Sequence, residues 1–179
     1  MFTTFKLDAA RWIVPGQIGD ARALTFARVC KLLFRHVALR ALMWFRFASW
    51  CKRNKIPYLP GAIQRGLLRN YGFEIMSGAD IGGGLYVAHP VGTVIMVNRM
   101  GTNCSVIAAA TIGMRNEWKF PDIGDQVFIG AGARVLGDLR VGNRAIIGAN
   151  AVVIEDVPDD ATVVGIPAKV IKVNGKPVH

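Results

Sequence analysis

Aliphatic side chains recur every six residues between Ile75 and Val153, and this spacing limits the possible folds more than any other feature of the sequence. Twelve of the thirteen repeating residues are Val or Ile, which suits short buried strands. The series is Ile75, Ile81, Val87, Val94, Met100, Val106, Ile112, Ile123, Ile129, Val135, Val141, Ile147 and Val153, with one residue added before Val94 and five before Ile123. An α-helix repeats about every 3.6 residues and cannot keep this spacing. The sequence therefore predicts a solenoid whose backbone turns a corner every six residues.

A second period, of three hexads, indicates that three sides close into one triangular coil. One side has Gly second in each hexad, at Gly82, Gly101, Gly124 and Gly142. The next side has a column of third-position residues, His89, Ala108, Ala131 and Ala149. The remaining side has large apolar second residues, Met76, Ile95, Leu136 and Ile154. We expect this last set to point outward as a stripe, which usually marks an interface with the N-terminal helices or with another solenoid.

The hexads IGDQVF-IGAGAR-VLGDLR-VGNRAI-IGANAV, closed by VPDDATVVGIPAKVIK, resemble the hexapeptide-repeat acyltransferases. The segment GADIGGGLYVAHPVG, followed by ATIG, most resembles the serine O-acetyltransferase branch, including its relatives in polysaccharide gene clusters. The resemblance covers about residues 73–173 and implies a mainly β fold, a left-handed parallel β-helix of about four coils. It also implies acetyl-CoA as co-substrate, no metal, and a homotrimer or multiple of three with active sites between subunits.

The resemblance assigns the chemistry to one histidine. Of the three His residues, His36 lies in a helical segment, His179 ends the chain, and His89 alone lies on the solenoid. In the resembled enzymes the His of this segment is the general base that deprotonates an acceptor hydroxyl. Imidazole suits that role because its unperturbed pKa is near 6.5. A structural role is the alternative for an isolated His.

The alanines above His89 predict a groove for the donor. Coils stack at about 4.8 Å, so the column spans about 14 Å. We expect a pantetheine arm to lie in this groove and to pair with backbone amides. Its predicted coenzyme contacts are Ala108, Ala131 and Ala149. In the closing segment, Lys169 and Lys172 are candidate contacts for the nucleotide phosphates, and solvated tail lysines are the alternative.

The segment 113–122 interrupts the hexads and predicts a loop that projects from the solenoid. Its candidate acceptor contacts are Arg115, Asn116, Glu117 and Trp118, because their polar groups and indole ring suit a polar, ring-shaped acceptor. A plain surface loop, or a contact with a neighbouring subunit, is the alternative.

Two departures from the resembled enzymes bear on the acceptor. Those enzymes carry Asp immediately before the His, where this chain has Ala88, and an Arg-His pair before a Pro, where it has Lys119 and Phe120. Glu117 is a candidate replacement for the missing acid. We therefore expect the acceptor to be a hydroxyl of a sugar, sugar-lipid or polysaccharide precursor, as in exopolysaccharide biosynthesis, and keep serine O-acetyltransferase as the alternative.

Two other functional classes share features with this sequence. A metal-dependent lyase of the γ-carbonic anhydrase type needs three His around zinc, and the solenoid has one. A non-catalytic membrane-docking or assembly protein stays as a second alternative, because the acid and the second His are missing.

Charge divides the chain into modules. Residues 1–72 hold thirteen Lys or Arg and two Asp or Glu, whereas residues 73–179 hold nine and ten. This asymmetry predicts a basic α-helical N-terminal module at 1–72, an acyltransferase domain at 73–173 and a tail at 174–179. Within the first module we expect one helix, capped by Asp20, to continue through residues 21–55, and a shorter helix at 62–72 after a break at Pro57, Pro60 and Gly61.

The basic module admits two interpretations. It either packs on the solenoid or a second subunit, or attaches residues 20–55 to an anionic inner-membrane surface through Trp44, Phe45, Phe47 and Trp50. No apolar run approaches the roughly 20 residues of a membrane span, and no nucleic-acid motif accompanies the basic residues. Three Cys without metal spacing, Cys104 at a buried position, and an N-terminus without signal-peptide order indicate the cytoplasm. The second interpretation of the basic module would add peripheral contact at the inner face of the membrane.

Overall fold

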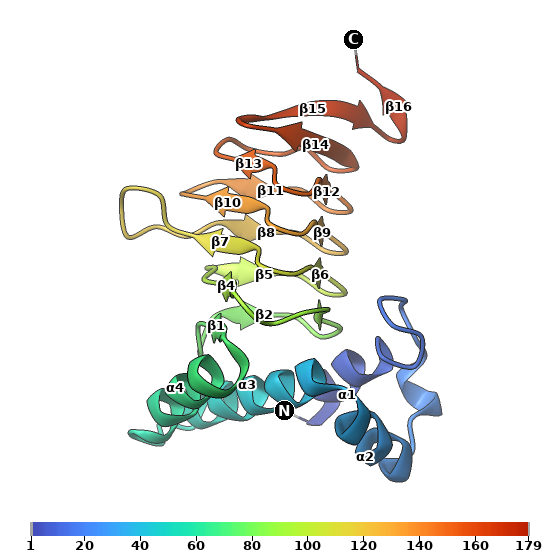
Figure 1. Ribbon diagram of the computed structural model, residues 1–179, viewed down its shortest axis with the longest axis vertical. Coiled ribbons are helices and arrows are strands. Elements are labelled where there is room, and N and C mark those ends of the chain that lie inside the picture. Colours follow the sequence, from blue (N-terminus) through green and yellow to red (C-terminus); the bar gives the residue numbers. More distant parts are fainter. Residues whose placement is uncertain (1, 179) are drawn as a thin grey trace.

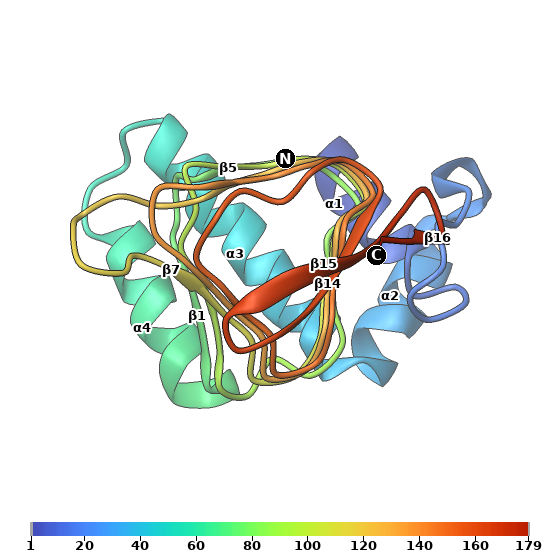
Figure 2. The same cartoon turned by 90° about the horizontal axis from the view of Figure 1, so that it is seen from above.

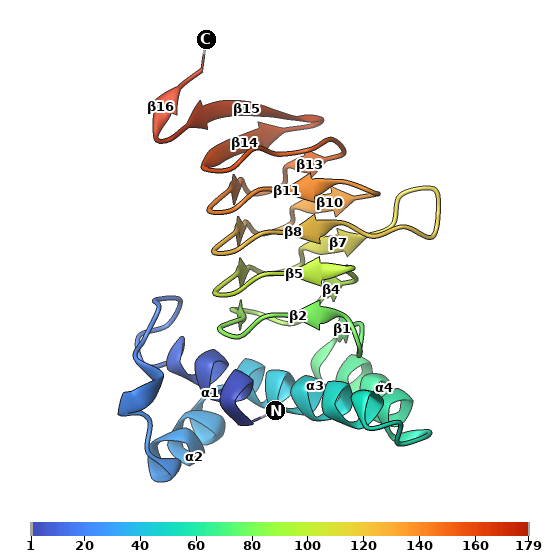
Figure 3. The same cartoon turned by 180° about the vertical axis from the view of Figure 1, so that it is seen from behind.

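The computed structural model describes residues 2–178 and places four helices across one end of a stack of short strands (Figures 1 and 3). The helical elements are α1 (Phe2–Ala10), a 3₁₀ turn (Ala21–Ala23), α2 (Phe26–Arg35), α3 (Val37–Arg53) and α4 (Leu59–Tyr71). The helix α1 was not predicted. Ala41, Leu42 and Phe45 of α3 belong to the same buried cluster as the solenoid core. The prediction that Phe45 lies at a membrane interface is therefore wrong, since the solenoid covers it.

The single helix predicted over 21–55 is divided. Asp20 accepts a hydrogen bond from the backbone N–H of Arg22 at 2.8 Å and caps only the 3₁₀ turn. The helix α2 starts after Thr25, whose hydroxyl accepts from the N–H of Arg28 at 3.3 Å. His36 has extended backbone (φ −116°) and separates α2 from α3. Capping side chains compete with a continuous helix here, which apolar spacing alone does not reveal.

The predicted break before the last helix lies one turn too late. Pro60 stands in the first turn of α4, where its missing N–H costs nothing. The helix ends at Gly72, whose left-handed φ of +59° lets its N–H reach the carbonyl of Leu68 at 2.9 Å.

The strands form three parallel sheets, one on each side of a triangle (Figure 2). The first sheet contains β1 (Phe73–Ile75), β4 (Thr93–Ile95), β7 (Thr111–Gly113), β10 (Arg134–Leu136) and β13 (Val152–Val153). The second contains β2 (Asp80–Ile81), β5 (Arg99–Met100), β8 (Asp122–Ile123) and β11 (Arg140–Val141). The third contains β3 (Tyr86–Val87), β6 (Ser105–Val106), β9 (Phe128–Ile129), β12 (Ile146–Ile147) and β14 (Ala161–Gly165), and the antiparallel strands β15 (Ala168–Val173) and β16 (Lys176–Pro177) extend it. Five strands on one side give five rungs rather than about four.

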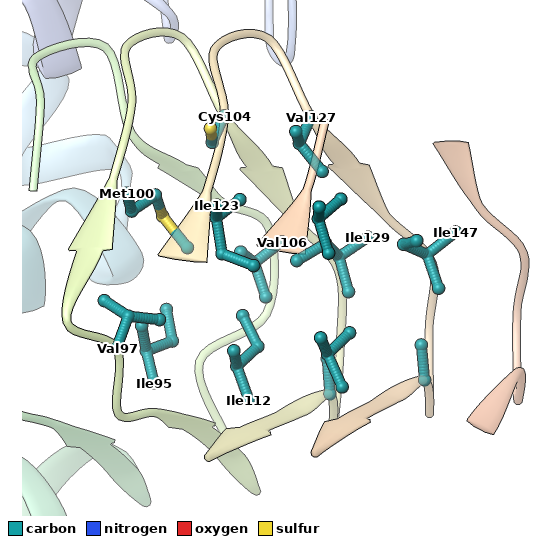
Figure 4. Packing of buried hydrophobic residues seen from close by; sticks show 14 of the residues in the cluster. Ile95, Val97, Met100, Cys104, Val106, Ile112, Ile123, Val127, Ile129 and Ile147 are labelled. Carbon is teal, nitrogen blue, oxygen red and sulfur yellow. The ribbon is translucent and has the colours of Figure 1, made fainter. Parts of the chain in front are cut away.

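The inward residues of the predicted series are buried, with one exception in the second rung (Figure 4). Strand pairing sets Ile95 opposite Ile75 and Ile112, so Ile95 points inward and Val94 does not. Ile95 and Val97 are both fully buried. The error arose because the corner before β4 holds two extra residues, not one, and the side chains of a strand alternate.

The same shift corrects the outward stripe. Met76 and Met96 donate their backbone N–H groups to Ile95 and Ile112, at 3.0 and 2.9 Å, and occupy equivalent positions one rung apart. Leu136 pairs with Gly113 on the same sheet. The stripe therefore runs through Met96 in place of Ile95, and Met76, Met96, Leu136 and Ile154 are each half-buried.

The glycine column is a steric requirement of the stacking. A Cβ on Gly82 would lie 2.7 Å from the carbonyl oxygen of Gly101, and one on Gly124 would lie 2.8 Å from the backbone nitrogen of Asn143. The backbone of the next rung cannot move aside without breaking its own hydrogen bonds, so this side of the triangle accepts no larger residue.

Candidate active site

His89 lies on an exposed corner, immediately after β3 and before β4. The preceding residue, Ala88, donates its N–H to Val106 of the next rung at 3.1 Å, which fixes the backbone but offers no side-chain acceptor. The hydrogen bonds of residues 2–178 include none to the His89 ring. The imidazole therefore faces solvent and is free to contact a ligand.

The end of α4 braces this corner. Gly92 donates its N–H to the carbonyl of Gly72 at 2.8 Å, and the N–H of Thr93 reaches Pro90 at 2.9 Å. The buried hydroxyl of Thr93 donates to the carbonyl of His89 at 3.1 Å. The backbone that carries the imidazole is thus held from both sides, whereas the ring itself is not.

The predicted alanine column stands in register above His89. Val87, Val106, Ile129 and Ile147 pair along the third sheet, so the residues two positions later, His89, Ala108, Ala131 and Ala149, occupy equivalent corners. Gly132 donates to the carbonyl of Ala108, and Asn150 to that of Ala131, both at 2.8 Å. None of the three alanines is buried. The arrangement brings together small accessible side chains along one edge of the solenoid.

Arg134 belongs to the same edge and was missed by the sequence reasoning. It starts β10, and one nitrogen of its guanidinium donates to the carbonyls of Ala109 at 2.6 Å and Gly132 at 3.0 Å. The sequence feature that could have indicated this contact is a basic residue at an outward position, three residues after the column residue Ala131.

Lys169 and Lys172 lie on the exposed strand β15, opposite Val164 and Thr162 of β14. Val164 is one rung beyond Gly148, the neighbour of Ala149. Lys169 therefore lies close to the C-terminal end of the column, and Lys172 lies further along the strand.

The segment between β7 and β8 forms the projecting loop that the sequence predicted, and Figure 1 shows it extending from the side of the stack. An open cleft of about 250 Å³ is lined by Arg115, Asn116, Glu117, Lys119, Leu136, Gly137, Asp138 and Ile154. Lys119 Nζ lies 3.0 Å from Glu117 and 3.7 Å from Asp138. The hydrogen bond to Glu117 raises the pKa of Lys119, so this amine stays protonated. Trp118 stands outside the lining, 75% exposed, with its ring edge against Phe120.

One chain does not bring His89 and this loop together. His89 precedes β4, the loop follows β7, and β4 and β7 are parallel neighbours in one sheet. The two features therefore lie at opposite ends of that side of the triangle. Glu117 is bonded to Lys119 and does not reach the imidazole of its own chain.

The other histidines add no described side chain to the His89 edge. His36 packs against the Trp12 ring at 4.7 Å, and burial lowers its pKa, whereas His179 lies outside the described residues. Within residues 2–178, no group of three His, Cys, Asp or Glu side chains has the arrangement of a metal site. The helices of the same residues include none with the length and apolarity required to cross a bilayer.

The repeat defines the class of the protein. A family model described as "Bacterial transferase hexapeptide (six repeats)" matches residues 120–155. Together with the three parallel sheets, this match confirms the predicted left-handed β-helix of the hexapeptide-repeat acyltransferases.

Relatives that match most of this chain identify the branch within the hexapeptide-repeat family. Serine acetyltransferase of Helicobacter pylori is 34% identical over 145 residues, which are 79% of this chain and 85% of the relative. Serine acetyltransferase of Synechococcus elongatus is 34% identical over 149 residues, 81% of this chain, and the chain spans 61% of that longer relative. A solved structure of serine acetyltransferase in complex with CoA has a TM-score of 0.76 at 27% identity, over 94% of this chain and 67% of the other. The chain belongs to the serine acetyltransferase family.

These relatives support the serine O-acetyltransferase branch rather than the polysaccharide-cluster type. They give no support to exopolysaccharide biosynthesis as the context of the protein.

Proposed function

We propose that this chain is an acetyl-CoA-dependent O-acetyltransferase in which His89 is the general base. The observation that carries the proposal is the register of the third sheet, which aligns an exposed imidazole with the accessible alanines Ala108, Ala131 and Ala149. A thioester carrier laid along this edge would present its acetyl group to His89, with Lys169 or Lys172 near its phosphates and Arg134 beside the middle of the column.

The reaction requires no covalent enzyme intermediate. His89 accepts the proton of the acceptor hydroxyl while the oxygen attacks the carbonyl carbon of the thioester. Backbone N–H groups at the corner are the candidates that stabilise the oxyanion. The tetrahedral intermediate expels the thiolate of coenzyme A, and the imidazolium returns the proton to sulfur. The products are an acetyl ester and free coenzyme A.

L-Serine is the proposed acceptor, because the full-length relatives are named serine acetyltransferases. A sugar hydroxyl is the second candidate, and a specific observation favours it. Ala88 and Phe120 stand where the resembled enzymes carry the acid beside the base and a second His, so two groups suited to an amino acid are replaced. The cleft beside Arg115, Asn116 and Glu117, with Trp118 exposed nearby, offers polar and aromatic contacts for either acceptor.

We also propose a trimer with its active sites between subunits. The support is the separation of His89 and the loop 113–122 at opposite ends of one side of the triangle, which leaves a single-chain site without acceptor contacts. A neighbouring solenoid would bring its own loop to the His89 corner. Light scattering should give a mass that is a multiple of three chains, and a monomer that turns over would contradict the shared site.

The deciding experiment measures release of the coenzyme A thiol from acetyl-CoA with L-serine and with nucleotide- and lipid-linked sugars. Thiol release that depends on L-serine supports the first acceptor, and release with a sugar alone supports the second. No release with any acceptor, together with no binding of coenzyme A by calorimetry, would contradict the enzymatic function and favour a non-catalytic assembly protein.

A further inference from the structure

The helix α3 has two faces with different surroundings. Leu42 and Phe45 are fully buried in the solenoid cluster, whereas Trp44 is 43% exposed and Trp50 is 38% exposed. Trp44, Phe47 and Trp50 form a contiguous row, with ring centroids 6.2 and 6.0 Å apart. At three-residue intervals on one helix, these rings share a side that the solenoid does not cover.

The aromatic row continues into an apolar cleft. A cleft of about 510 Å³ lies between α1, α2 and α3, with Phe5, Phe26, Leu33, Met43, Trp44 and Phe47 in its walls. The helix α2 beside it has no buried residue, and Phe34 on the same helix is 89% exposed. An apolar cleft with protruding rings is a surface that water solvates poorly.

Positive charge surrounds this surface with almost no compensation. Residues 1–72 contain only two acids, Asp8 and Asp20. Asp8 is buried and paired with Arg46, so it contributes no negative charge at the surface. The helix α2 exposes Arg28, Lys31 and Arg35 along one side and Phe26 and Phe34 along another, and α3 adds Arg53 at its end.

We propose that this face of α2 and α3 docks the protein peripherally on an anionic lipid bilayer. Charge complementarity selects this occupant, because clustered Lys and Arg are attracted to anionic headgroups. Trp and Phe side chains insert at the headgroup boundary, where one end of an indole stays wet. The docking face is distinct from the His89 edge, so the proposal does not depend on the acceptor or on catalysis. Figures 1 and 3 show the helices at the end of the stack opposite the C-terminus, which leaves the rungs beyond the bilayer.

The test is co-sedimentation of the full chain with vesicles. Vesicles of phosphatidylglycerol and phosphatidylcholine in equal parts should bind the protein, and phosphatidylcholine alone should bind it much more weakly. Added salt should weaken binding, because the Debye length is about 10 Å at 0.1 M. Neutralisation of Arg28, Lys31 and Arg35 to Gln should reduce the partition coefficient at least about tenfold, since each basic residue near the surface contributes about fivefold. The triple change Phe34→Ser, Trp44→Ser and Trp50→Ser should give a similar loss.

Matched controls lie at other parts of the molecule. Trp118→Ser with Ile166→Ser removes two side chains that are each 75% exposed, and Lys169→Gln, Lys172→Gln and Lys176→Gln remove three charges on the closing hairpin and tail. Neither control should change vesicle binding. Failure of the native chain to bind anionic vesicles, or equal losses in the controls, would overturn the proposal. Light scattering tests whether this face instead binds a second copy of the chain. In that case the Phe34, Trp44 and Trp50 changes would lower the oligomeric mass, and lipid would have no effect.

Discussion

Asp8 of α1 and Arg46 of α3 form a buried ion pair beneath the first rung of the solenoid, with Nε of Arg46 2.7 Å from Oδ2 of Asp8. Arg46 also donates to the carbonyls of Ile81 and Gly82, both at 2.6 Å. The second carboxylate oxygen of Asp8 accepts from the N–H of Leu85 at 2.9 Å. One pair therefore ties two helices to the rung whose chain continues to His89.

Replacement of Arg46 by Met should leave the Asp8 carboxylate buried without a countercharge. We expect the free energy of unfolding to fall by about 3–5 kcal/mol, the usual cost of removing one partner of a buried pair. Urea denaturation measures the change. Arg53→Met on the same helix is the control, because Arg53 is exposed and should shift the value by no more than about 0.5 kcal/mol. Equal effects of the two substitutions would mean that the pair is not a structural tie.

Two glycines should respond to the same substitution with opposite signs. Gly124→Ala places a methyl group 2.8 Å from the backbone of the next rung, and the solenoid should lose stability by about 1–3 kcal/mol. Gly66 lies within α4 and a Cβ there meets nothing within 4 Å, so Gly66→Ala should add about 0.5–1 kcal/mol. Thermal denaturation of the two variants measures both. A stabilising Gly124→Ala would contradict the steric account of the column.

The regular rungs could be predicted from the sequence because a six-residue period forces one inward residue per side, whatever surrounds it. The corner after His89 could not, because its two extra residues are absorbed by a turn that Gly72, the C-cap residue of α4, stabilises from outside the repeat. Likewise, the start of α2 depends on the Thr25 cap, and the division between α2 and α3 depends on His36 in extended backbone. These are local hydrogen bonds and tertiary contacts, and apolar periodicity carries no information about them.

The candidate site, like the fold, could be predicted from the sequence only in part. The column of His89 and its alanines followed from the three-hexad period, since register fixes which residues stack. Arg134 was missed because its role depends on the direction of a long side chain toward the carbonyl of Ala109. The separation between the loop and His89 was not predicted either. It follows only when the order of the hexads around the triangle is combined with the direction of the strands.

Substitution of His89 by Ala should lower kcat/KM for O-acetylation by at least about 100-fold, the usual contribution of a general base. The melting temperature should stay the same, because the imidazole is exposed and makes no hydrogen bond among the described residues. His36→Ala is the matched control, since His36 packs on Trp12 among the helices and is not a column residue, and its kcat/KM should change little. Undiminished turnover in His89→Ala would remove this residue from the mechanism.

The three cysteines should differ in reactivity toward a thiol reagent. Burial raises the pKa of Cys104 to about 11, so only about a thousandth of it would be thiolate at pH 8. Cys51 is also buried, whereas Cys30 is exposed on α2. We expect one rapidly labelled thiol in the folded chain and none in Cys30→Ser, with mass spectrometry as the readout. Labelling of Cys104 should rise only as the pH approaches 11 or after denaturation, and rapid labelling at pH 8 would contradict its burial.

A larger side chain in the alanine column should obstruct the donor without disturbing the fold. Ala131 is half-buried at the corner, midway along the edge between His89 and Lys169, so Ala131→Leu projects three further carbons into the proposed path of the pantetheine arm. The KM for acetyl-CoA should rise at least about tenfold, because about 1.4 kcal/mol of lost contact corresponds to that factor. The KM for the acceptor should not follow, since the proposed acceptor contacts come from the loop 113–122 and not from the column. Ala62→Leu on the exposed surface of α4 controls for the added bulk, and steady-state kinetics with each substrate varied in turn separate the two constants. An unchanged KM for acetyl-CoA would mean that the donor lies elsewhere.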